Sequence, residues 1–256
     1  FPKSYFSKEL NSTLQLSPYL NGGLFTEQRL DSIGIKVSDD DFLRIYNFFN
    51  RYNFTIREDL PLEEEVAVDP EMIGKVYESL VNLSEASDER GDAGIFYTPR
   101  AEIDFMCRLS LVEYLDHHLA PTPSKDYIYK FIFAKTEEEL KEAIDHLKIT
   151  HVWPNLFEDS LDNLTIVDPA VGSGSFLVGM LNVLTELYKL VYKDIGRTTD
   201  DFEIKKQIIG RSLYGVDVME WAVHVCELRL WLQLVVEADI PLSERKTSPL
   251  LPNLTF

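Results

Sequence analysis

One glycine-rich segment, DPAVGSGSF at Asp168–Phe176, restricts the possible folds of this chain more than any other feature. It follows the apolar run Leu164–Val167 and leads into a long helical pattern. Glycines let a backbone approach a ligand closely, and the first turn of the following helix presents free N–H groups. The layout repeats when the apolar run Leu213–Val218 is followed by a second helix. Strand, turn, helix, strand and helix predict the start of an open parallel α/β sheet.

The side chains of this segment indicate which ligand it could bind. Asp168 ends the first strand, where its carboxylate would stabilise a ligand ammonium and repel a pyrophosphate. The dinucleotide fingerprint G-x-G-x-x-G fits Gly172 and Gly174, but the third glycine, Gly179, comes two positions late. The acid of the second strand, Asp217, lies 45 residues after Gly172, whereas a dinucleotide site has it after roughly 20 residues. The pattern therefore argues against a NAD site.

Three motifs in order resemble those of the γ-class N6-adenine DNA methyltransferases of restriction–modification systems, as in type I modification subunits and fused type IIG enzymes. DPAVGSGSF resembles motif I (D-P-A-C-G-S-G-x-F), the earlier GIFYTPR resembles motif X, and LYGVDV resembles motif II. PYLNGGLF and DPEMIGKVYESL resemble the helical segment that joins a nuclease to the methylase in type IIG relatives. The resemblance covers most of the chain and implies an α/β fold. A helical N-terminal region would precede the first strands and helices of a Rossmann-like, truncated methyltransferase sheet.

The resemblance implies a site for S-adenosyl-L-methionine. Asp168 would stand near the methionine amino group, and Asp217 would hold the ribose hydroxyls, although its carboxylate could instead be a helix cap. The segment 97–99 would close over the methionine end, or could simply start a helix. Val171 replaces the usual Cys, and Met219 stands where many relatives have a second acid. The residues assigned to the cofactor are Tyr97, Thr98, Pro99, Asp168, Pro169, Ala170, Gly172, Gly174, Phe176 and Asp217.

The catalytic motif IV of this family, Asn/Asp/Ser-Pro-Pro-Tyr/Phe, does not occur in the 256 residues. We therefore assign no catalytic residue and no metal ligand, and expect the chain to be inactive by itself although its parent protein transfers methyl groups. A sheet cut before its third strand would expose apolar surface and could lead to self-association. Two alternatives stay open, a small-molecule or protein methyltransferase and a non-catalytic connector or scaffold.

Small, charged and glycine residues gather at 84–94 (SEASDERGDAG), which indicates a boundary. We expect a helical connector at 1–93 and the N-terminal part of a methyltransferase domain, with motifs X, I and II, at 94–256. A helix is predicted after Ser38 as N-cap, with its aromatic face in the core. A second begins at Pro99 with Thr98 as N-cap. Trp221 and Trp231 are interpreted as core residues.

The net charge of the chain indicates how strongly it could bind DNA. The chain carries 25 Lys and Arg against 43 Asp and Glu, a net charge of −18. The part up to Ala93 and the part after it carry −9 each. DNA affinity of this chain should be weak or absent, so double-stranded DNA is expected as a partner of the intact parent only. No signal peptide or membrane span is evident, and Cys107 and Cys226 lie in apolar patterns typical of buried free thiols, so we expect a cytoplasmic protein.

Overall fold

A computed structural model describes residues 34, 36–49, 51, 72, 76, 98–119, 124–150, 152–153, 156–235 and 237. The segments 18–25 and 84–94 and most of 69–80 lie outside these residues, so the predicted connector and its boundary stay predictions. Among the described residues, no helix is both long and apolar enough to cross a bilayer. The elements are α2 (Asp39–Phe49), α4 (Arg100–His118), α5 (Lys125–Phe133), α6 (Glu137–Ile149), the π-helical turn η4 (Leu156–Leu161), β1 (Ile166–Asp168), α8 (Ser175–Asp194), α9 (Asp201–Arg211), β2 (Leu213–Gly215) and α10 (Glu220–Val235).

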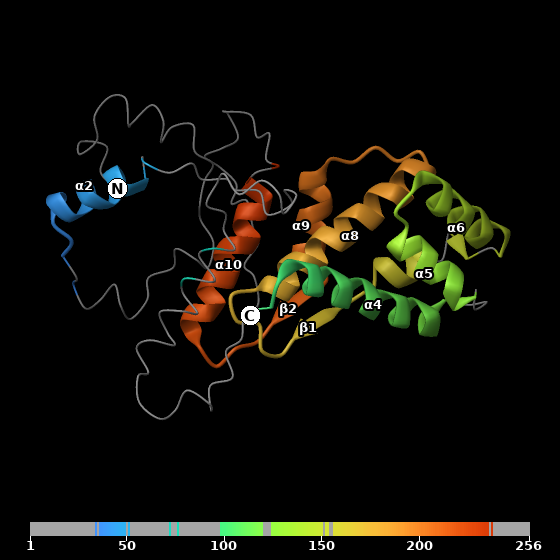
Figure 1. The fold of residues 1–256 in the computed structure, drawn as a ribbon, viewed down its shortest axis with the longest axis horizontal. Helices are drawn as coiled ribbons and strands as arrows, with labels where there is room; N and C mark the ends of the chain where they lie inside the picture. The colour runs from blue at the N-terminus through green and yellow to red at the C-terminus, as the bar shows by residue number, and fades with distance from the viewer. Residues whose placement is uncertain are drawn as a thin grey trace.

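The described sheet has two short parallel strands. β1 pairs with β2 in the register Ile166 to Leu213 and Asp168 to Gly215. The crossover between them is formed by α8 and α9, which lie side by side (Figure 1). This confirms the predicted parallel α/β arrangement of strand, turn, helix and strand, within a chain whose described part is mostly helical.

Helix α4 lies across α8 because a glycine lets the two backbones approach. A Cβ atom at Gly179 would meet Ile103 Cγ2 at 2.5 Å, so only a residue without a side chain fits at this crossing. Arg108 of α4 ties the same pair of helices together by an ion pair of 2.6 Å to Glu186 of α8. The late third glycine of the sequence motif is therefore a packing residue between helices.

The core is one continuous apolar cluster in which α8 is central. Eleven of the twenty residues of α8 are buried. Helices α4, α9 and α10 pack against α8, and α5 packs against α4 (Figure 1). The polar Tyr188 hydroxyl of α8 donates to the Leu161 carbonyl at 3.0 Å, so its burial is compensated. The core therefore holds α8, and with it the glycine turn at its start, from several sides.

Several local predictions need correction. Helix α4 begins at Arg100, one residue later than predicted, because Pro99 has an extended ψ of 153° and is itself the N-cap, with no side-chain capping bond from Thr98. The second strand ends at Gly215 instead of Val218. Helix α9 was not predicted. Ser38 does cap α2, accepting from Asp41 N–H at 3.2 Å.

Two aromatic predictions were wrong. On α2, Phe42 is 61% exposed and Tyr46 is 55% exposed, so this face is not part of the described core. Trp221 in the first turn of α10 is 52% exposed, whereas Trp231 packs against the core as predicted. Helical spacing predicts which residues share a face but does not show whether another element covers that face.

Candidate functional site

The segment 169–174 folds into a compact turn between β1 and α8. Ala170 N–H donates to Asp168 Oδ1 at 3.1 Å, and Gly174 N–H donates to the Val171 carbonyl at 2.8 Å. Val171 N–H reaches across to the Val216 carbonyl at 3.0 Å. The turn is thus closed on itself and joined to the chain that follows β2, at the carboxyl ends of both strands.

Gly172 and Gly174 differ in the space that surrounds their Cα atoms. Gly172 has φ of +51°, and a Cβ there would meet only the Ala170 carbonyl oxygen, at 4.0 Å. Gly174 has φ of +84°, and its Cβ would lie 2.5 Å from Cys226 Sγ and 3.2 Å from Cys226 Cα. Gly174 is therefore required for packing against α10, while Gly172 leaves open space beside the backbone where a ligand could approach.

Asp168 holds a carboxylate oxygen that has no partner. Its Oδ2 is buried without a hydrogen bond, while Oδ1 accepts from Ala170. Burial raises the pKa of Asp168, the Ala170 bond opposes that rise, and the negative charge of Asp217 adds to it. A buried acceptor of this kind is costly unless a ligand satisfies it, and a ligand ammonium would do so with opposite charge.

Asp217 joins the loops after the two strands. Its Oδ2 accepts from Gly172 N–H and its Oδ1 accepts from Met219 N–H, each at 2.8 Å. The second bond lies just before α10, which begins at Glu220, so Asp217 precedes the N-cap position and is not itself the helix cap. Each carboxylate oxygen has a further lone pair, so these bonds leave acceptor capacity for a hydroxyl group, and the ribose role stays a prediction.

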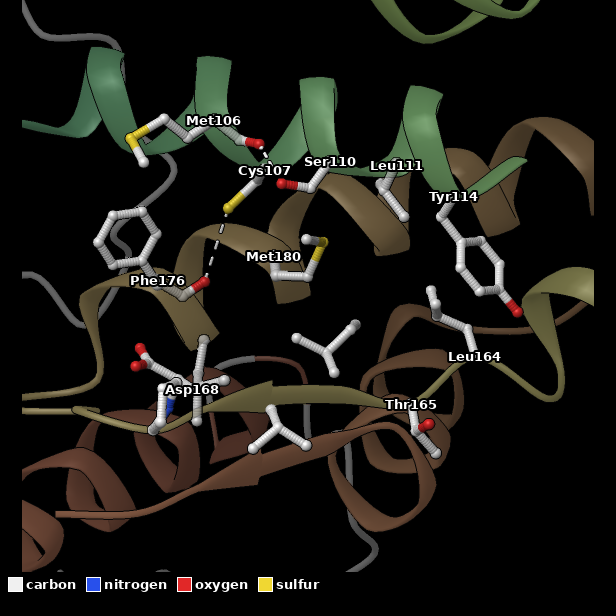
Figure 2. A pocket seen from close by; sticks show the side chains of 14 residues that line it. Met106, Cys107, Ser110, Leu111, Tyr114, Leu164, Thr165, Asp168, Phe176 and Met180 are labelled. Atoms are coloured by element: carbon white, nitrogen blue, oxygen red, sulfur yellow. Dashed lines mark hydrogen bonds between the residues drawn. The ribbon is translucent and has the colours of Figure 1, made fainter. Parts of the chain in front are cut away.

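A cleft of about 470 Å³ runs along β1 between α4 and α8, with Asp168 at one end. Figure 2 shows side chains of α4 facing those of β1 and α8 across this space. The lining is mostly apolar and comprises Met106, Cys107, Ser110, Leu111, Tyr114, Leu164, Thr165, Ile166, Val167, Asp168, Pro169, Phe176, Leu177 and Met180. The α4 residues of this cleft were missed from the sequence, where they read only as an apolar helix face.

The predicted cofactor residues therefore fall into three groups. Asp168, Pro169 and Phe176 line the cleft. Ala170, Gly172, Gly174 and Asp217 build the turn and its attachment. Thr98 and Pro99 lie at the start of α4, one turn before its crossing with α8, and are not among the cleft residues. Tyr97 lies outside the described residues.

Both cysteines are buried and free, as predicted. The Cys107 thiol is 3.7 Å from the Phe176 carbonyl oxygen, within the cleft lining (Figure 2). Burial is the main cause that raises the pKa of Cys107, and likewise that of Cys226, to about 12. Neither thiol is therefore suited to act as a nucleophile at neutral pH.

One residue that no motif indicated also contacts the turn. Arg229 of α10 is 2% exposed, and its Nη1 donates to the Ser173 carbonyl at 2.9 Å, Ser173 Oγ at 3.2 Å and Ser175 Oγ at 3.0 Å. The only sequence signal was an arginine within an otherwise apolar stretch, CELRLWL. An arginine placed on a buried helix face usually has specific acceptors there.

Among the described residues, one group has metal-ligand geometry, namely Glu113, Asp116 and His117 on α4. Lys125 Nζ lies 2.6 Å from Glu113 and 3.9 Å from Asp116, so its ammonium already compensates these carboxylates. The group therefore supports no metal site.

The described residues form a parallel α/β unit whose candidate site lies at the carboxyl ends of the strands and combines a glycine turn with a buried carboxylate oxygen that has no hydrogen bond. Known proteins include relatives of this chain. Residues 145–253 match the DNA-methyltransferase domain of MmeI. Over 241 residues, 93% of this chain, the sequence is 32% identical to the "Putative type II restriction enzyme and methyltransferase" of Methanocaldococcus jannaschii.

These two matches confirm the resemblance to methyltransferases of restriction–modification systems, and residues 145–253 are the part that corresponds to a DNA-methyltransferase domain. The matched region includes the glycine turn, Asp217 and Arg229. The chain spans about a fifth (20%) of the length of the M. jannaschii protein.

Proposed function

We propose that this chain carries the S-adenosyl-L-methionine-binding part of a site-specific DNA adenine-N6 methyltransferase of a restriction–modification system. The observation that carries the proposal is the buried, unpartnered Oδ2 of Asp168 beside a glycine turn in which Gly172 leaves open space. The match to a DNA-methyltransferase domain supports DNA as the substrate class. The sheet of the parent protein would then be Rossmann-like.

The residues present fit this cofactor. Asp168 would accept hydrogen bonds from the methionine ammonium, and the backbone at Gly172 would allow close approach of the methionine chain. Asp217 would accept from the ribose hydroxyls through its remaining lone pairs. The segment 97–99 would close the methionine end. When bound, the cofactor supplies an electrophilic methyl group on its sulfonium.

The adenine half of the site would come from elsewhere in the parent protein. Transfer to an exocyclic amine requires a base taken out of the duplex stack and acceptors for the N6 hydrogens. The tetrapeptide that offers them in this family is absent from the 256 residues. We propose that this chain positions the methyl donor and that the target adenine is held by the remainder.

Partners follow from the charge. With −18 shared evenly between the two parts, few phosphates can be neutralised, so duplex DNA would be a partner of the intact protein and a weak one, or none, of this chain. Apolar surface is exposed near the two strands, since Val167 of β1 is 61% exposed and Val216, just after β2, is 56% exposed. This surface could support self-association. Sedimentation velocity over a range of concentrations tests that point.

The transfer experiment uses tritiated S-adenosyl-L-methionine and adenine-rich duplex DNA with the chain alone, the C-terminal remainder of the parent alone, and both together. Label in DNA only on mixing supports the proposal. Label in DNA with the chain alone would show that the catalytic residues are misassigned. Label in a protein or a small molecule would favour another methyltransferase class, and the absence of cofactor binding would favour a connector.

A further inference from the structure

Arg229 is a buried cation on the face of α10 that packs below the glycine turn. Its neighbours in the helix, Cys226 and Leu230, are fully buried core residues. Removing a guanidinium from water is unfavourable unless hydrogen bonds replace its hydration. The acceptors named above are the carbonyl oxygen and Oγ of Ser173 in the turn, and Oγ of Ser175, the first residue of α8. These bonds connect the side chain to the glycine turn and to the start of α8.

Asp217 makes a second side-chain hydrogen bond to the turn, as an acceptor where Arg229 is a donor. Asp217 accepts from Gly172 N–H at 2.8 Å, while Arg229 donates to the carbonyl of the following residue, Ser173, at 2.9 Å. An acceptor from the chain after β2 and a donor from α10 therefore hold two consecutive residues. We call these two contacts the turn clamp.

The backbone of the turn explains what such a clamp contributes. Gly172 and Gly174 both have positive φ and flank Ser173. Glycine has more accessible backbone conformations than any other residue, so a segment with two of them loses much entropy when it is fixed. Side-chain contacts to Gly172 and Ser173 restrict the segment where the glycines leave it least constrained.

We propose that Arg229 is a positioning residue that holds the glycine turn in its ligand-binding shape through Ser173 and Ser175. In this role its guanidinium acts through the turn and does not itself bind the ligand. The role in ligand binding rests on the proposed function, because it assumes that the turn receives S-adenosyl-L-methionine. The ordering of the turn by Arg229 is a property of the ligand-free chain and is tested separately.

Hydrogen exchange of the ligand-free protein tests the clamp. In Arg229→Gln, amides of residues 172–176 should exchange at least about tenfold faster than in the wild type, while the interior of α8 changes little. Arg229→Lys, which keeps a cation and donors, should restore part of the protection. Leu230→Val is the control, because it truncates the next buried side chain of α10 without removing a hydrogen bond to the turn. An equal increase throughout α8 and α10, or none, would overturn the proposal.

Coupling to Ser175 gives a second readout that survives if Arg229→Gln fails to fold. If the guanidinium acts through this hydroxyl, Ser175→Ala should raise exchange of the turn in the wild type by more than it does in Arg229→Lys, which replaces the guanidinium bonds only in part. Full additivity would contradict the coupling.

Binding is then measured by calorimetric titration with S-adenosyl-L-methionine. Affinity should fall about tenfold or more in Arg229→Gln and stay unchanged in Leu230→Val. If the wild type binds no cofactor, the proposed function fails, whereas the exchange experiment still decides whether Arg229 orders the turn. If the wild type binds and Arg229→Gln binds equally well, the positioning role is refuted.

Discussion

Alanine substitutions at the two glycines of the turn should have different effects: Gly174→Ala should mainly lower stability, and Gly172→Ala should mainly impair ligand binding. Both have positive φ, so each substitution strains the backbone, by about 1–2 kcal/mol. Only Gly174→Ala adds a collision, because its Cβ would lie 2.5 Å from Cys226 Sγ and 3.2 Å from Cys226 Cα. The second of these atoms belongs to the backbone of α10, so rotation of the thiol cannot relieve the crowding.

We expect Gly174→Ala to lower the free energy of unfolding by about 2–5 kcal/mol, the sum of backbone strain and overpacking. For a domain of about 150–250 residues this corresponds to a fall in Tm of about 4–20 °C. Gly172→Ala should cost only the strain term, because a Cβ there meets a single atom at 4.0 Å. It should nevertheless impair ligand binding, since the new methyl group occupies the open space beside the turn.

Urea denaturation gives the two stabilities, and calorimetric titration with S-adenosyl-L-methionine gives the two affinities. Cys226→Ala combined with Gly174→Ala should recover part of the lost stability, because it removes the Sγ atom. The reasoning would be refuted if both glycine variants were equally destabilised, or if Gly172→Ala bound the cofactor as well as the wild type while Gly174→Ala remained fully stable.

Three further predictions address the acid of the second strand, the thiols and DNA. Asp217→Ala should weaken cofactor binding by about 1–3 kcal/mol, both through the ribose hydroxyls and through the lost Gly172 contact; equal calorimetric affinities would contradict its role. Burial raises the pKa of Cys107 and Cys226 to about 12, so the thiolate fraction at pH 8 is about one in ten thousand. Ellman's reagent should therefore label both thiols rapidly only in denaturant. Rapid labelling of the native protein would be inconsistent with their burial. A chain with a net charge of −18 should give no gel shift with duplex DNA at micromolar protein in physiological salt, and a clear shift would refute the charge argument.

The glycine turn was predictable because the residues that form it are neighbours in the sequence. Strand, turn and helix are consecutive in the sequence, and Asp168, Gly172 and Gly174 occupy the turn or its border as expected. The parallel pairing of the two strands also followed from the order of elements, since a crossover helix between two strands favours parallel neighbours.

Contacts between distant segments were not predictable. Nothing in the sequence pairs Arg229 with Ser173, or Cys226 with Gly174, because these contacts depend on how α10 returns beneath the turn. The α4 side of the cleft was missed for the same reason. The exposure of Trp221 was misjudged because a helical apolar pattern shows which residues share a face but does not show what covers that face.

Calorimetric titration of the wild type and Asp168→Asn tests whether Asp168 receives the amino group of S-adenosyl-L-methionine. Loss of a charge-assisted hydrogen bond worth about 1.5–3 kcal/mol should weaken binding about 10- to 150-fold. Asp201→Asn is the matched control, since that acid pairs with Lys189 at 2.8 Å on the surface of α8 and α9.

The pH dependence of the cofactor affinity gives a second test in the same titrations. Because burial raises the pKa of Asp168, and its protonated form is a poor acceptor for an ammonium, wild-type affinity should fall as the pH decreases through that raised pKa. Asp168→Asn should lack this dependence. Saturable wild-type binding that is weakened by Asp168→Asn and unchanged in Asp201→Asn is the predicted result. No binding by the wild type, or equal affinity and equal pH dependence in Asp168→Asn, would contradict the account.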